Sequence, residues 1–255
     1  MGTIVVTGSA GGIGQATRDR LAGDGHEVIG VDLRDAEVIA DLSTAAGRSA
    51  MIGAVAAASG GRIDGLVAGA GISGPDPAEV VSINYFGAVA TIAGLRPLLV
   101  DGADPSAVAV SSNSSTAMAD LPEALVEACL NDDETAARAL AGDDAIVAYA
   151  ASKLALARWV RRAAAGPDWA GSGIRLNAVA PGLIDTPMTA DMLEFVLSLG
   201  DVYPIPLARA GRPEEVASLL AFLLSPDAGF FCGSVVFMDG GSDAALNADA
   251  WPTIR

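Results

Sequence analysis

Residues 3–14 read Thr3-Ile4-Val5-Val6-Thr7-Gly8-Ser9-Ala10-Gly11-Gly12-Ile13-Gly14, and this stretch decides the fold. The β-branched run predicts a strand, and residues 13–22 have helical character. Strand, glycine-rich turn and helix in this order form the context of a dinucleotide-binding fingerprint. Gly8 allows the tight turn, Gly12 lets the backbone approach a pyrophosphate, and Gly14 lets helix and strand pack closely. The alternative is an ordinary flexible turn in a chain with 30 glycines.

Asp32 ends the next apolar run, residues 28–31, eighteen positions after Gly14. A carboxylate there accepts hydrogen bonds from ribose hydroxyls and repels a 2′-phosphate. Residues 9–11 contain no basic side chain to neutralise such a phosphate, although Arg34 is close enough to reach one. The pattern therefore favours NAD over NADP.

Tyr149 and Lys153 form a second motif, four positions apart. In a helix this spacing places both side chains on one face. An ammonium close to a phenol favours the phenolate and lowers a pKa that is ordinarily about 10. Such a tyrosine can take a proton from an alcohol, or return one to a carbonyl oxygen, near neutral pH. Alone the pair is weak evidence, because the same spacing is common on solvated helices.

Together these motifs resemble the classical short-chain dehydrogenase/reductase family over nearly the whole chain. The matching segments are Thr7-Gly8-x-x-x-Gly12-Ile13-Gly14, Asp41-Leu42, Asn84, Val110-Ser111-Ser112, Tyr149-x-x-x-Lys153, Arg175 to Gly182 with Thr186, and Asp239-Gly240-Gly241. Their order and separations are far more specific than any one of them. The resemblance implies an NAD(H)-dependent enzyme that interconverts secondary alcohols and ketones by hydride transfer.

The resemblance also implies the roles of individual residues. Tyr149 is expected to be the general acid/base, with Ser112 binding the substrate oxygen. Lys153 is expected to tune Tyr149 and bind the nicotinamide ribose, and Asn84 to hold a water. The neighbouring serines Ser111, Ser114 and Ser115 are alternatives to Ser112. The expected cofactor-binding residues are Gly8, Gly11, Gly12, Ile13, Gly14, Asp32, Asp41, Leu42, Ala70, Gly71, Lys153, Pro181, Gly182, Ile184 and Thr186.

The chain departs from the family pattern at two places in its first half. The family's Asn-Asn-Ala-Gly stands here as Ala68-Gly69-Ala70-Gly71, so a side-chain support of the sheet is missing. Only eight residues separate Asp32 from Asp41, too few for a crossover helix. We therefore expect a third strand at 37–40, joined by a bare loop.

A third departure is an insertion at about 119–146, between Ser112 and Tyr149. It carries eight carboxylates against Arg138 alone, and it contains helical patterns at 122–130 and 134–140. It is either a solvated surface excursion or a cover for the face of the helix preceding Tyr149, which many relatives of the family use to form tetramers. These features resemble the bacterial 3α-hydroxysteroid dehydrogenase/carbonyl reductase subgroup, which implies a homodimer acting on steroids or assorted carbonyl compounds.

Length and composition indicate one globular domain, residues 1–255, with 51% apolar residues to fill its core. We predict strands near 3–6, 27–31, 37–40, 64–68, 106–111, 173–179 and 234–238. We predict helices near 13–23, 45–58, 79–99, 147–165 and 213–224. This alternation predicts an α/β fold, a Rossmann-type doubly wound parallel sheet of about seven strands with helices on both faces and a small helical insertion before the catalytic helix.

The net charge of −16 argues against nucleic acid and anionic membrane partners. We expect neither a transmembrane helix nor a signal peptide. Cys129 and Cys232 are isolated, which fits a reducing cytoplasm. With His26 as the single histidine, no metal site and no zinc-dependent alcohol dehydrogenase chemistry is expected.

The substrate side is expected at about 186–209, where Met188, Met192, Phe195 and Leu199 recur at helical spacing. Such a face can form a lid over a hydrophobic substrate, or it can pack on the body. No basic residue occurs from 184 to 208, which argues against an anionic substrate. We prefer a steroid or another bulky cyclic alcohol or ketone, with a smaller cyclic or terpenoid alcohol as the alternative. An NAD-sensing regulator without chemistry and a halohydrin dehalogenase-type lyase are the rivals, and the Tyr149–Lys153 pair argues against both.

Overall fold

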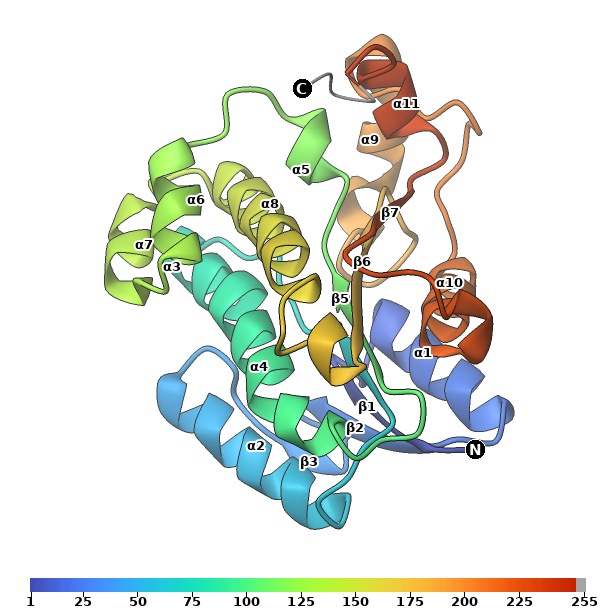
Figure 1. The fold of residues 1–255 in the computed structure, drawn as a ribbon. Coiled ribbons are helices and arrows are strands. Elements are labelled where there is room, and N and C mark those ends of the chain that lie inside the picture. The colour runs from blue at the N-terminus through green and yellow to red at the C-terminus, as the bar shows by residue number, and fades with distance from the viewer. Residues whose placement is uncertain (251–255) are drawn as a thin grey trace.

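The sheet has seven parallel strands in the order β3-β2-β1-β4-β5-β6-β7, with helices on both faces (Figure 1). This computed structural model describes residues 1–250. The strands are β1 Thr3–Thr7, β2 Glu27–Asp32, β3 Val38–Ile39, β4 Gly65–Ala68, β5 Ser106–Val110, β6 Arg175–Pro181 and β7 Val235–Met238. The predicted doubly wound α/β fold is confirmed. Because the chain order reverses at β1, such a sheet binds ligands beyond the carboxyl ends of its central strands.

The helices differ in length and lie on both faces of the sheet. The longer ones are α1 Gly12–Gly23, α2 Ala45–Ala58, α4 Ala88–Leu99, α8 Ala145–Ala164 and α10 Pro213–Leu224. The shorter ones are α3 Pro77–Val81, α5 Ser114–Ala117, α6 Glu123–Leu130, α7 Glu134–Leu140, α9 Leu193–Ser198 and α11 Ser242–Leu246. Helices α1 and α10 cover one face of the sheet, and α2, α4 and α8 cover the other (Figure 1).

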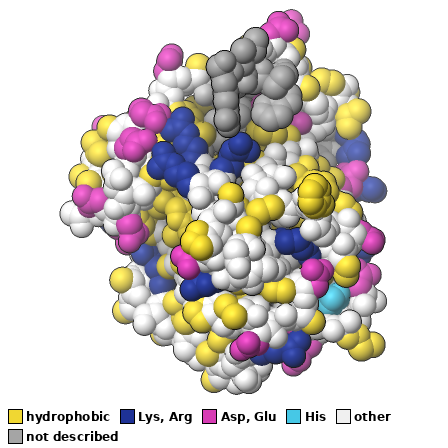
Figure 2. Space-filling model, in the orientation of Figure 1, with side chains coloured by type: hydrophobic (Ala, Val, Ile, Leu, Met, Phe, Trp, Pro, Cys, Tyr) yellow, Lys and Arg dark blue, Asp and Glu magenta, His cyan; other side chains and the backbone are white. Residues whose placement is uncertain are grey.

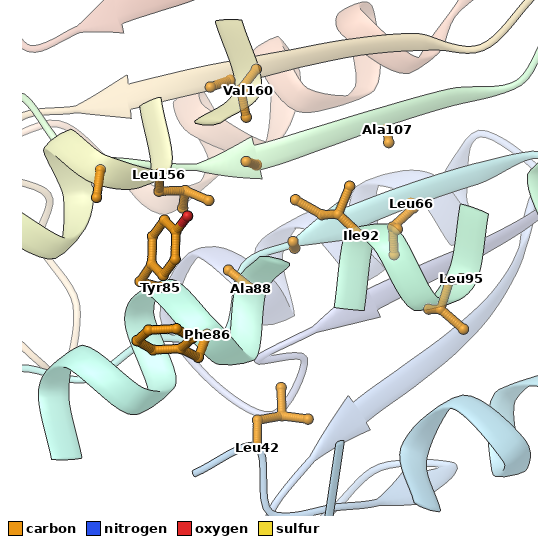
Figure 3. Close-up of a cluster of buried hydrophobic side chains, with 14 of the residues drawn as sticks. Leu42, Leu66, Tyr85, Phe86, Ala88, Ile92, Leu95, Ala107, Leu156 and Val160 are labelled. Carbon is orange, nitrogen blue, oxygen red and sulfur yellow. The ribbon is translucent and has the colours of Figure 1, made fainter. Parts of the chain in front are cut away.

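Apolar burial fixes α8 in place. Leu66 of β4, Ile92 of α4 and Leu156 of α8 are fully buried on the same side of the sheet (Figure 3). Burying a leucine or isoleucine side chain contributes about 1.5–3 kcal/mol. This packing fixes the position of α8 relative to the sheet, and so it also fixes the positions of Tyr149 and Lys153, which α8 carries.

The third strand is shorter than predicted, with only Val38 and Ile39 pairing with the end of β2. The bare loop before it is confirmed, and the Glu37 side chain stabilises it. The Glu37 carboxylate accepts a hydrogen bond from the Gly30 amide at 2.8 Å and pairs with Arg18 of α1. The loop is thus tied to both β2 and α1 without a crossover helix.

The helix predicted at 79–99 is interrupted by a π-helix, η1, at Ser82–Gly87. From Pro77 to Leu99 it is long and apolar enough to cross a membrane, but 61% of its apolar window is buried inside the molecule. No other helix in the described residues, 1–250, is long and apolar enough to cross a membrane. It packs against α2, α8 and the sheet as a core element.

The insertion is helical where the sequence predicts it, at α6 and α7. Leu125, Val126 and Cys129 of α6 are fully buried, and α6 packs against α8. The insertion thus covers α8 and is not a solvated excursion.

The single helix face predicted for 186–209 is wrong in detail. The segment breaks into the 3-10 helix η3 Ala190–Met192, the short α9 and the 3-10 helix η4 Gly200–Val202. Met188, Met192 and Phe195 are 49%, 38% and 65% exposed, so these side chains do not pack on the body as a core face would.

Candidate active site

A cavity of about 320 Å³ opens at the carboxyl ends of β1, β4, β5 and β6. It runs from the glycine loop to α8, so the structure brings the two sequence motifs into one site. Most of the predicted site residues line it, namely Gly8, Gly11, Gly12, Ile13, Gly14, Asp32, Gly71, Ser112, Tyr149, Lys153, Pro181, Gly182, Ile184 and Thr186.

The glycine loop has the shape of a phosphate cradle. Gly8 has a φ of +74°, a conformation that favours glycine. A Cβ on Gly14 would lie 1.9 Å from the Gly8 carbonyl oxygen, so only glycine allows this approach. A Cβ on Gly11 would meet no atom within 4 Å, and no side chain caps α1. Open space beside an uncapped helix N-terminus fits the pyrophosphate of a dinucleotide.

Asp32 lies at the same end of the cavity. Its two oxygens accept hydrogen bonds from the Ala10 amide at 3.0 Å and the Leu33 amide at 2.7 Å. A carboxylate oxygen can accept more than one hydrogen bond, so the group can still bind ribose hydroxyls. The cradle and this carboxylate together fit an adenine dinucleotide. Arg34 lines the cavity as well.

Lys153 is buried at the opposite end. Its ammonium donates a hydrogen bond to the Val110 carbonyl oxygen at 2.8 Å and lies 5.8 Å from the centroid of the Tyr149 ring. The Ser111 hydroxyl donates to the Lys153 carbonyl oxygen at 2.8 Å, which ties α8 to the end of β5 a second time. Burial lowers the pKa of Lys153 to about 8.

The pKa of Tyr149 is raised, chiefly because the phenol is buried. The nearby Ser112 hydroxyl acts in the opposite direction, and the nearby Tyr203 adds to the rise. The net shift is therefore opposite to the predicted lowering, and the Lys153 ammonium, which is hydrogen-bonded to Val110, is not among the groups that shift this pKa. A nicotinamide dinucleotide, when bound, supplies the hydride acceptor for alcohol oxidation and the donor for ketone reduction.

Four predicted residues lie outside the cavity lining: Asn84, Asp41, Leu42 and Ala70. The Asn84 amide exchanges two hydrogen bonds with the Ile72 backbone, at 2.8 and 3.0 Å. A Cβ on Gly71 would lie 3.0 Å from the Asn84 oxygen and 3.3 Å from the Lys153 ammonium. Asn84 therefore lies next to Gly71 and Lys153, which line the cavity, but does not line the cavity itself.

The other three residues, Asp41, Leu42 and Ala70, have contacts with other parts of the protein. Asp41 is exposed and accepts a hydrogen bond from the Ser43 amide at 2.9 Å. Leu42 is buried and packs beside Gly87 of η1. Ala70 is held through its amide, which donates to the Thr7 hydroxyl at 3.1 Å.

Thr189 lines the cavity and was missed in the sequence. Its hydroxyl accepts a hydrogen bond from the Thr186 amide at 3.1 Å and donates to the Ile184 carbonyl oxygen. Thr186 and Thr189, three positions apart after the end of β6, are a pattern that predicts such a local turn. Asn113, which follows Ser112 in the chain, was also missed.

Comparison with known protein families decides the identity. Residues 2–121 match the model described as short chain dehydrogenase, and residues 133–243 match one described as enoyl-(acyl carrier protein) reductase. A 3-alpha-hydroxysteroid dehydrogenase/carbonyl reductase of Comamonas testosteroni is 43% identical over 256 residues, covering 96% of this chain and 98% of the relative. The chain belongs to the short-chain dehydrogenase family. It is thus an oxidoreductase that uses a nicotinamide coenzyme.

Two further relatives of this short-chain dehydrogenase bear on its ligands. The crystal structure of a 3-alpha-hydroxysteroid dehydrogenase from Pseudomonas sp. B-0831, complexed with NADH, superimposes with a TM-score of 0.87. It shares 43% identity over 97% of this chain and 99% of its own. A cis-4-hydroxycyclohexanecarboxylate dehydrogenase of Sinomonas cyclohexanicum is 34% identical, over 94% of this chain and 96% of its own.

Figure 2 shows acidic side chains dispersed over one face of the molecule, with the basic side chains in separate small groups and not in a continuous stripe. In residues 1–250 no three His, Cys, Asp or Glu side chains gather as a metal site would require.

Proposed function

We propose that this chain is an NAD(H)-dependent dehydrogenase/reductase of bulky hydrophobic cyclic alcohols and ketones, of the 3α-hydroxysteroid type. One observation carries the proposal: Tyr149 and Ser112 line the same cavity as the phosphate cradle and Asp32. A substrate oxygen beside that phenol would lie at one end of a site whose other end fits adenosine.

In this mechanism Tyr149 exchanges a proton with the substrate oxygen. Ser112 hydrogen-bonds the same oxygen and holds it beside the phenol. Lys153, fixed by Val110, places a cation near the ring and favours the phenolate as it forms. Asn84 supports the Gly71–Ile72 backbone next to Lys153, and the water that we assign to it would connect this lysine to solvent.

NAD is the proposed coenzyme. Asp32 has free lone pairs for ribose hydroxyls and would repel a 2′-phosphate, and residues 9–11 bring no cation to that place. The relative from Pseudomonas was crystallised with NADH. Asp41, Leu42 and Ala70 do not line the cavity, and we propose that they shape the coenzyme pocket from behind its wall.

The proposed substrate class has two supports. The relatives from Comamonas and Pseudomonas carry 3-alpha-hydroxysteroid dehydrogenase names, and Met188 and Phe195 expose apolar surface on the substrate side. A smaller cyclic alcohol is the second candidate, favoured by the Sinomonas relative. That relative's name specifies a carboxylate, however, and residues 184–208 of this chain offer no basic side chain to bind one.

The deciding experiment follows absorbance at 340 nm with NAD and NADP against a 3α-hydroxysteroid, cyclohexanol and a cyclic diketone. We expect turnover with NAD and the steroid as the best pair. Tyr149→Phe should lose activity by about 10²–10⁴-fold, because general acid–base catalysis contributes that much. NADH binding to this variant, followed by fluorescence, should stay intact. Residual turnover above a tenth of normal would remove Tyr149 from the mechanism.

We also propose a cytoplasmic homodimer made of single-domain chains. The packing of α7 on α3 and η1 supports the dimer, because it covers the helix preceding Tyr149, whose face the family resemblance associates with tetramers. Light scattering after size exclusion should give twice the mass of the chain, and a mass four times that of the chain would contradict the proposal.

A further inference from the structure

The outer part of the segment 186–209 has one side-chain attachment to the body. Between residues 193 and 204, within the described chain, Tyr203 alone shows a side-chain hydrogen bond to another element. Its hydroxyl donates to the Asn113 amide oxygen at 2.9 Å. Phe195 and Val202 are 65% and 77% exposed, and Leu193, Val196 and Leu199 are only partly buried, so no apolar side chain of residues 193–202 is buried in the core.

The direction of this hydrogen bond is fixed by its surroundings. The Asn113 amide nitrogen faces the Asp239 carboxylate at 3.4 Å, and an ionised carboxylate only accepts. Asp239 is itself held by the Gly241 and Asp243 amides at 3.0 and 2.7 Å. The Asn113 oxygen must therefore face Tyr203, which donates.

Asn113 is anchored directly beside the catalytic end of the cavity. It follows Ser112 in the chain, and its backbone amide donates to the Pro181 carbonyl oxygen at 2.9 Å. Tyr203 is thus tied to the residue next to Ser112 and, through Asp239, to the end of β7. It also lies within electrostatic reach of Tyr149, since its charge would raise the pKa of that phenol.

The two ends of the segment join the same region. At its start, Met188 and Thr189 line the cavity. At its end, the Leu207 amide donates to the Gly240 carbonyl oxygen at 3.1 Å, and Pro206 packs against Gly241. The Tyr203–Asn113 bond closes the span between these two attachments.

We propose that the Tyr203–Asn113 hydrogen bond is a clasp that holds residues 186–209 beside the Ser112–Tyr149 end of the cavity, and that Tyr203 is thereby a positioning residue for bulky substrates. The substrate part rests on the proposed function. A small alcohol would bind without contacting residues 193–204, whereas a steroid extends beyond the catalytic pair and needs this outer part of the segment as a wall.

Tyr203→Phe tests the clasp, because it removes the hydroxyl and keeps the ring. Tyr85→Phe is the matched control, since Tyr85 is buried in the core away from the cavity. A net hydrogen bond of about 1 kcal/mol corresponds to roughly a fivefold change in an equilibrium constant. We expect the KM for a 3α-hydroxysteroid to rise roughly fivefold in Tyr203→Phe, with kcat, the KM for cyclohexanol and NADH affinity within twofold of normal.

A second readout needs no turnover. Chymotrypsin should cleave after the exposed Phe195 roughly fivefold faster in Tyr203→Phe than in the wild type or Tyr85→Phe, because cleavage follows the population of the opened segment. In an Asn113→Ala background the same substitution should add nothing, as expected when both variants break one bond.

The outcomes separate the clasp from the function. Unchanged cleavage after Phe195 in Tyr203→Phe overturns the clasp. Faster cleavage with an unchanged steroid KM overturns its role in substrate affinity. If the wild type turns over no steroid at all, the proposed substrate is wrong, and the cleavage experiment still decides whether the clasp exists.

Discussion

Two adjacent serines at the end of β5 have different partners. The Ser111 hydroxyl donates to the Lys153 carbonyl oxygen at 2.8 Å, and so it is occupied by the backbone of α8. The Ser112 hydroxyl accepts a hydrogen bond from the Ser114 amide at 3.2 Å and lines the cavity together with Tyr149. Sequence motifs place the catalytic serine within one position of either residue. The contacts favour Ser112 for chemistry and Ser111 for structure.

Alanine at each position should separate these roles. Ser112→Ala should lower kcat by about 10²-fold, because one preorganised donor to the reacting oxygen is lost. Ser111→Ala should keep activity within about threefold and lower the free energy of unfolding by about 1 kcal/mol, because one buried hydrogen bond is lost. Initial rates and urea denaturation measure the two effects. The reverse pattern would show that Ser111 is the catalytic serine.

The raised pKa of Tyr149 sets the pH dependence of the two reaction directions. The phenol is protonated at neutral pH in the coenzyme-free enzyme, which is the form that donates a proton to a ketone. Alcohol oxidation needs the phenolate, so its kcat/KM should rise from pH 7 to about pH 8 and less steeply above that, where Lys153 begins to lose the charge that favours the phenolate. The kcat/KM for ketone reduction should stay level and then fall. An oxidation profile that declines between pH 7 and pH 9 would contradict this assignment.

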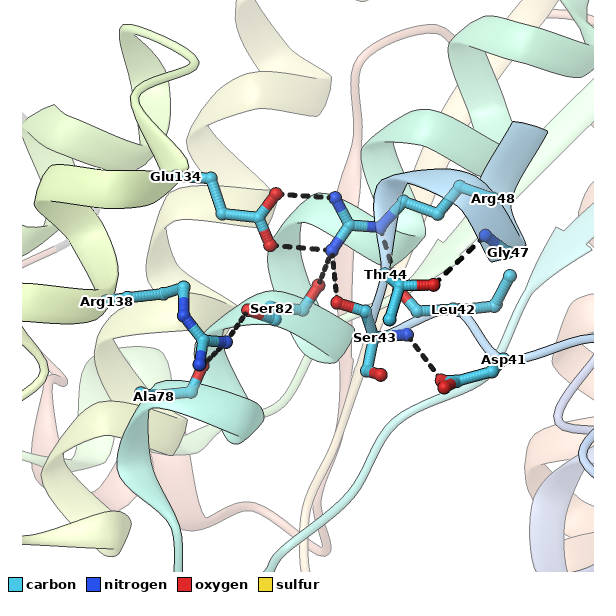
Figure 4. Close-up of polar contacts among 10 residues, drawn as sticks. All are labelled: Asp41, Leu42, Ser43, Thr44, Gly47, Arg48, Ala78, Ser82, Glu134 and Arg138. Carbon is cyan, nitrogen blue, oxygen red and sulfur yellow. Dashed lines mark hydrogen bonds and ion pairs between the residues drawn. The ribbon is translucent and has the colours of Figure 1, made fainter.

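At the scale of elements, the insertion is fastened by one buried arginine (Figure 4). Arg48 of α2 makes two 2.7 Å hydrogen bonds to the Glu134 carboxylate of α7. It also donates to the Leu42 and Ser82 carbonyl oxygens at 2.7 and 3.0 Å. Arg138 of the insertion donates to the Ser82 hydroxyl at 2.5 Å. These bonds join α7 to α2 and to the start of η1, the turn that carries Asn84.

Glu134→Gln should therefore destabilise the protein by roughly 1–3 kcal/mol at pH 7, because a bidentate partner of a buried guanidinium is lost. Glu127→Gln is the matched control: this exposed insertion carboxylate lies 3.8 Å from Arg162, and exposed pairs contribute under about 1 kcal/mol. Urea denaturation measures both. Equal effects of the two substitutions would show that the Arg48 contact does not fasten the insertion.

The Arg48–Glu134 pair also predicts how the stability of the protein changes at acid pH. Burial alone would raise the pKa of Glu134, but hydrogen bonds from Arg48 and Ser82, with the charges of Arg48 and Arg138, hold it below its usual 4.5. Its contribution to stability is therefore complete above pH 4.5 and is lost as the pH falls through the lowered value. The stability difference between wild type and Glu134→Gln should shrink over that range.

The elements differ in how well the sequence predicts them, and the reason is local. Helix α7 is predicted to the residue, because Asp133 caps its first turn by accepting from the Ala136 amide at 2.9 Å. The predicted helix spacing in 186–209 fails because Pro187 and Gly200 limit any helix there and little packs against it. Propensity alone does not hold a short helix in water.

For the whole molecule, the fold and most of the cavity follow from the glycine loop and the alternation of strands and helices. Parallel strands bring their carboxyl ends to one edge, so motifs that end strands must meet there. The Tyr203–Asn113–Asp239 chain is different, since its bonds join residues 90 and 126 positions apart. No local pattern marks such contacts, and they emerge only once β5, β7 and the segment between β6 and α10 are placed together.

The surplus of negative charge should make the stability of the fold depend on salt. The chain has 31 acidic and 15 Lys and Arg residues, so about half of the carboxylates have no cation to offset them. Mutual repulsion destabilises the compact state, and salt screens it, with a Debye length of about 10 Å at 0.1 M. Salt also weakens exposed pairs such as Arg20–Asp24, but each contributes under about 1 kcal/mol.

Repulsion should dominate, so raising NaCl from 0.05 to 0.5 M should increase the Tm. A gain of roughly 1 kcal/mol corresponds to about 2–4 °C for a domain of this size. KCl at equal ionic strength is the control, since screening depends on ionic strength and not on which cation is present. A Tm that falls with both salts would mean that attractive pairs, and not the surplus of carboxylates, govern the electrostatics of this fold.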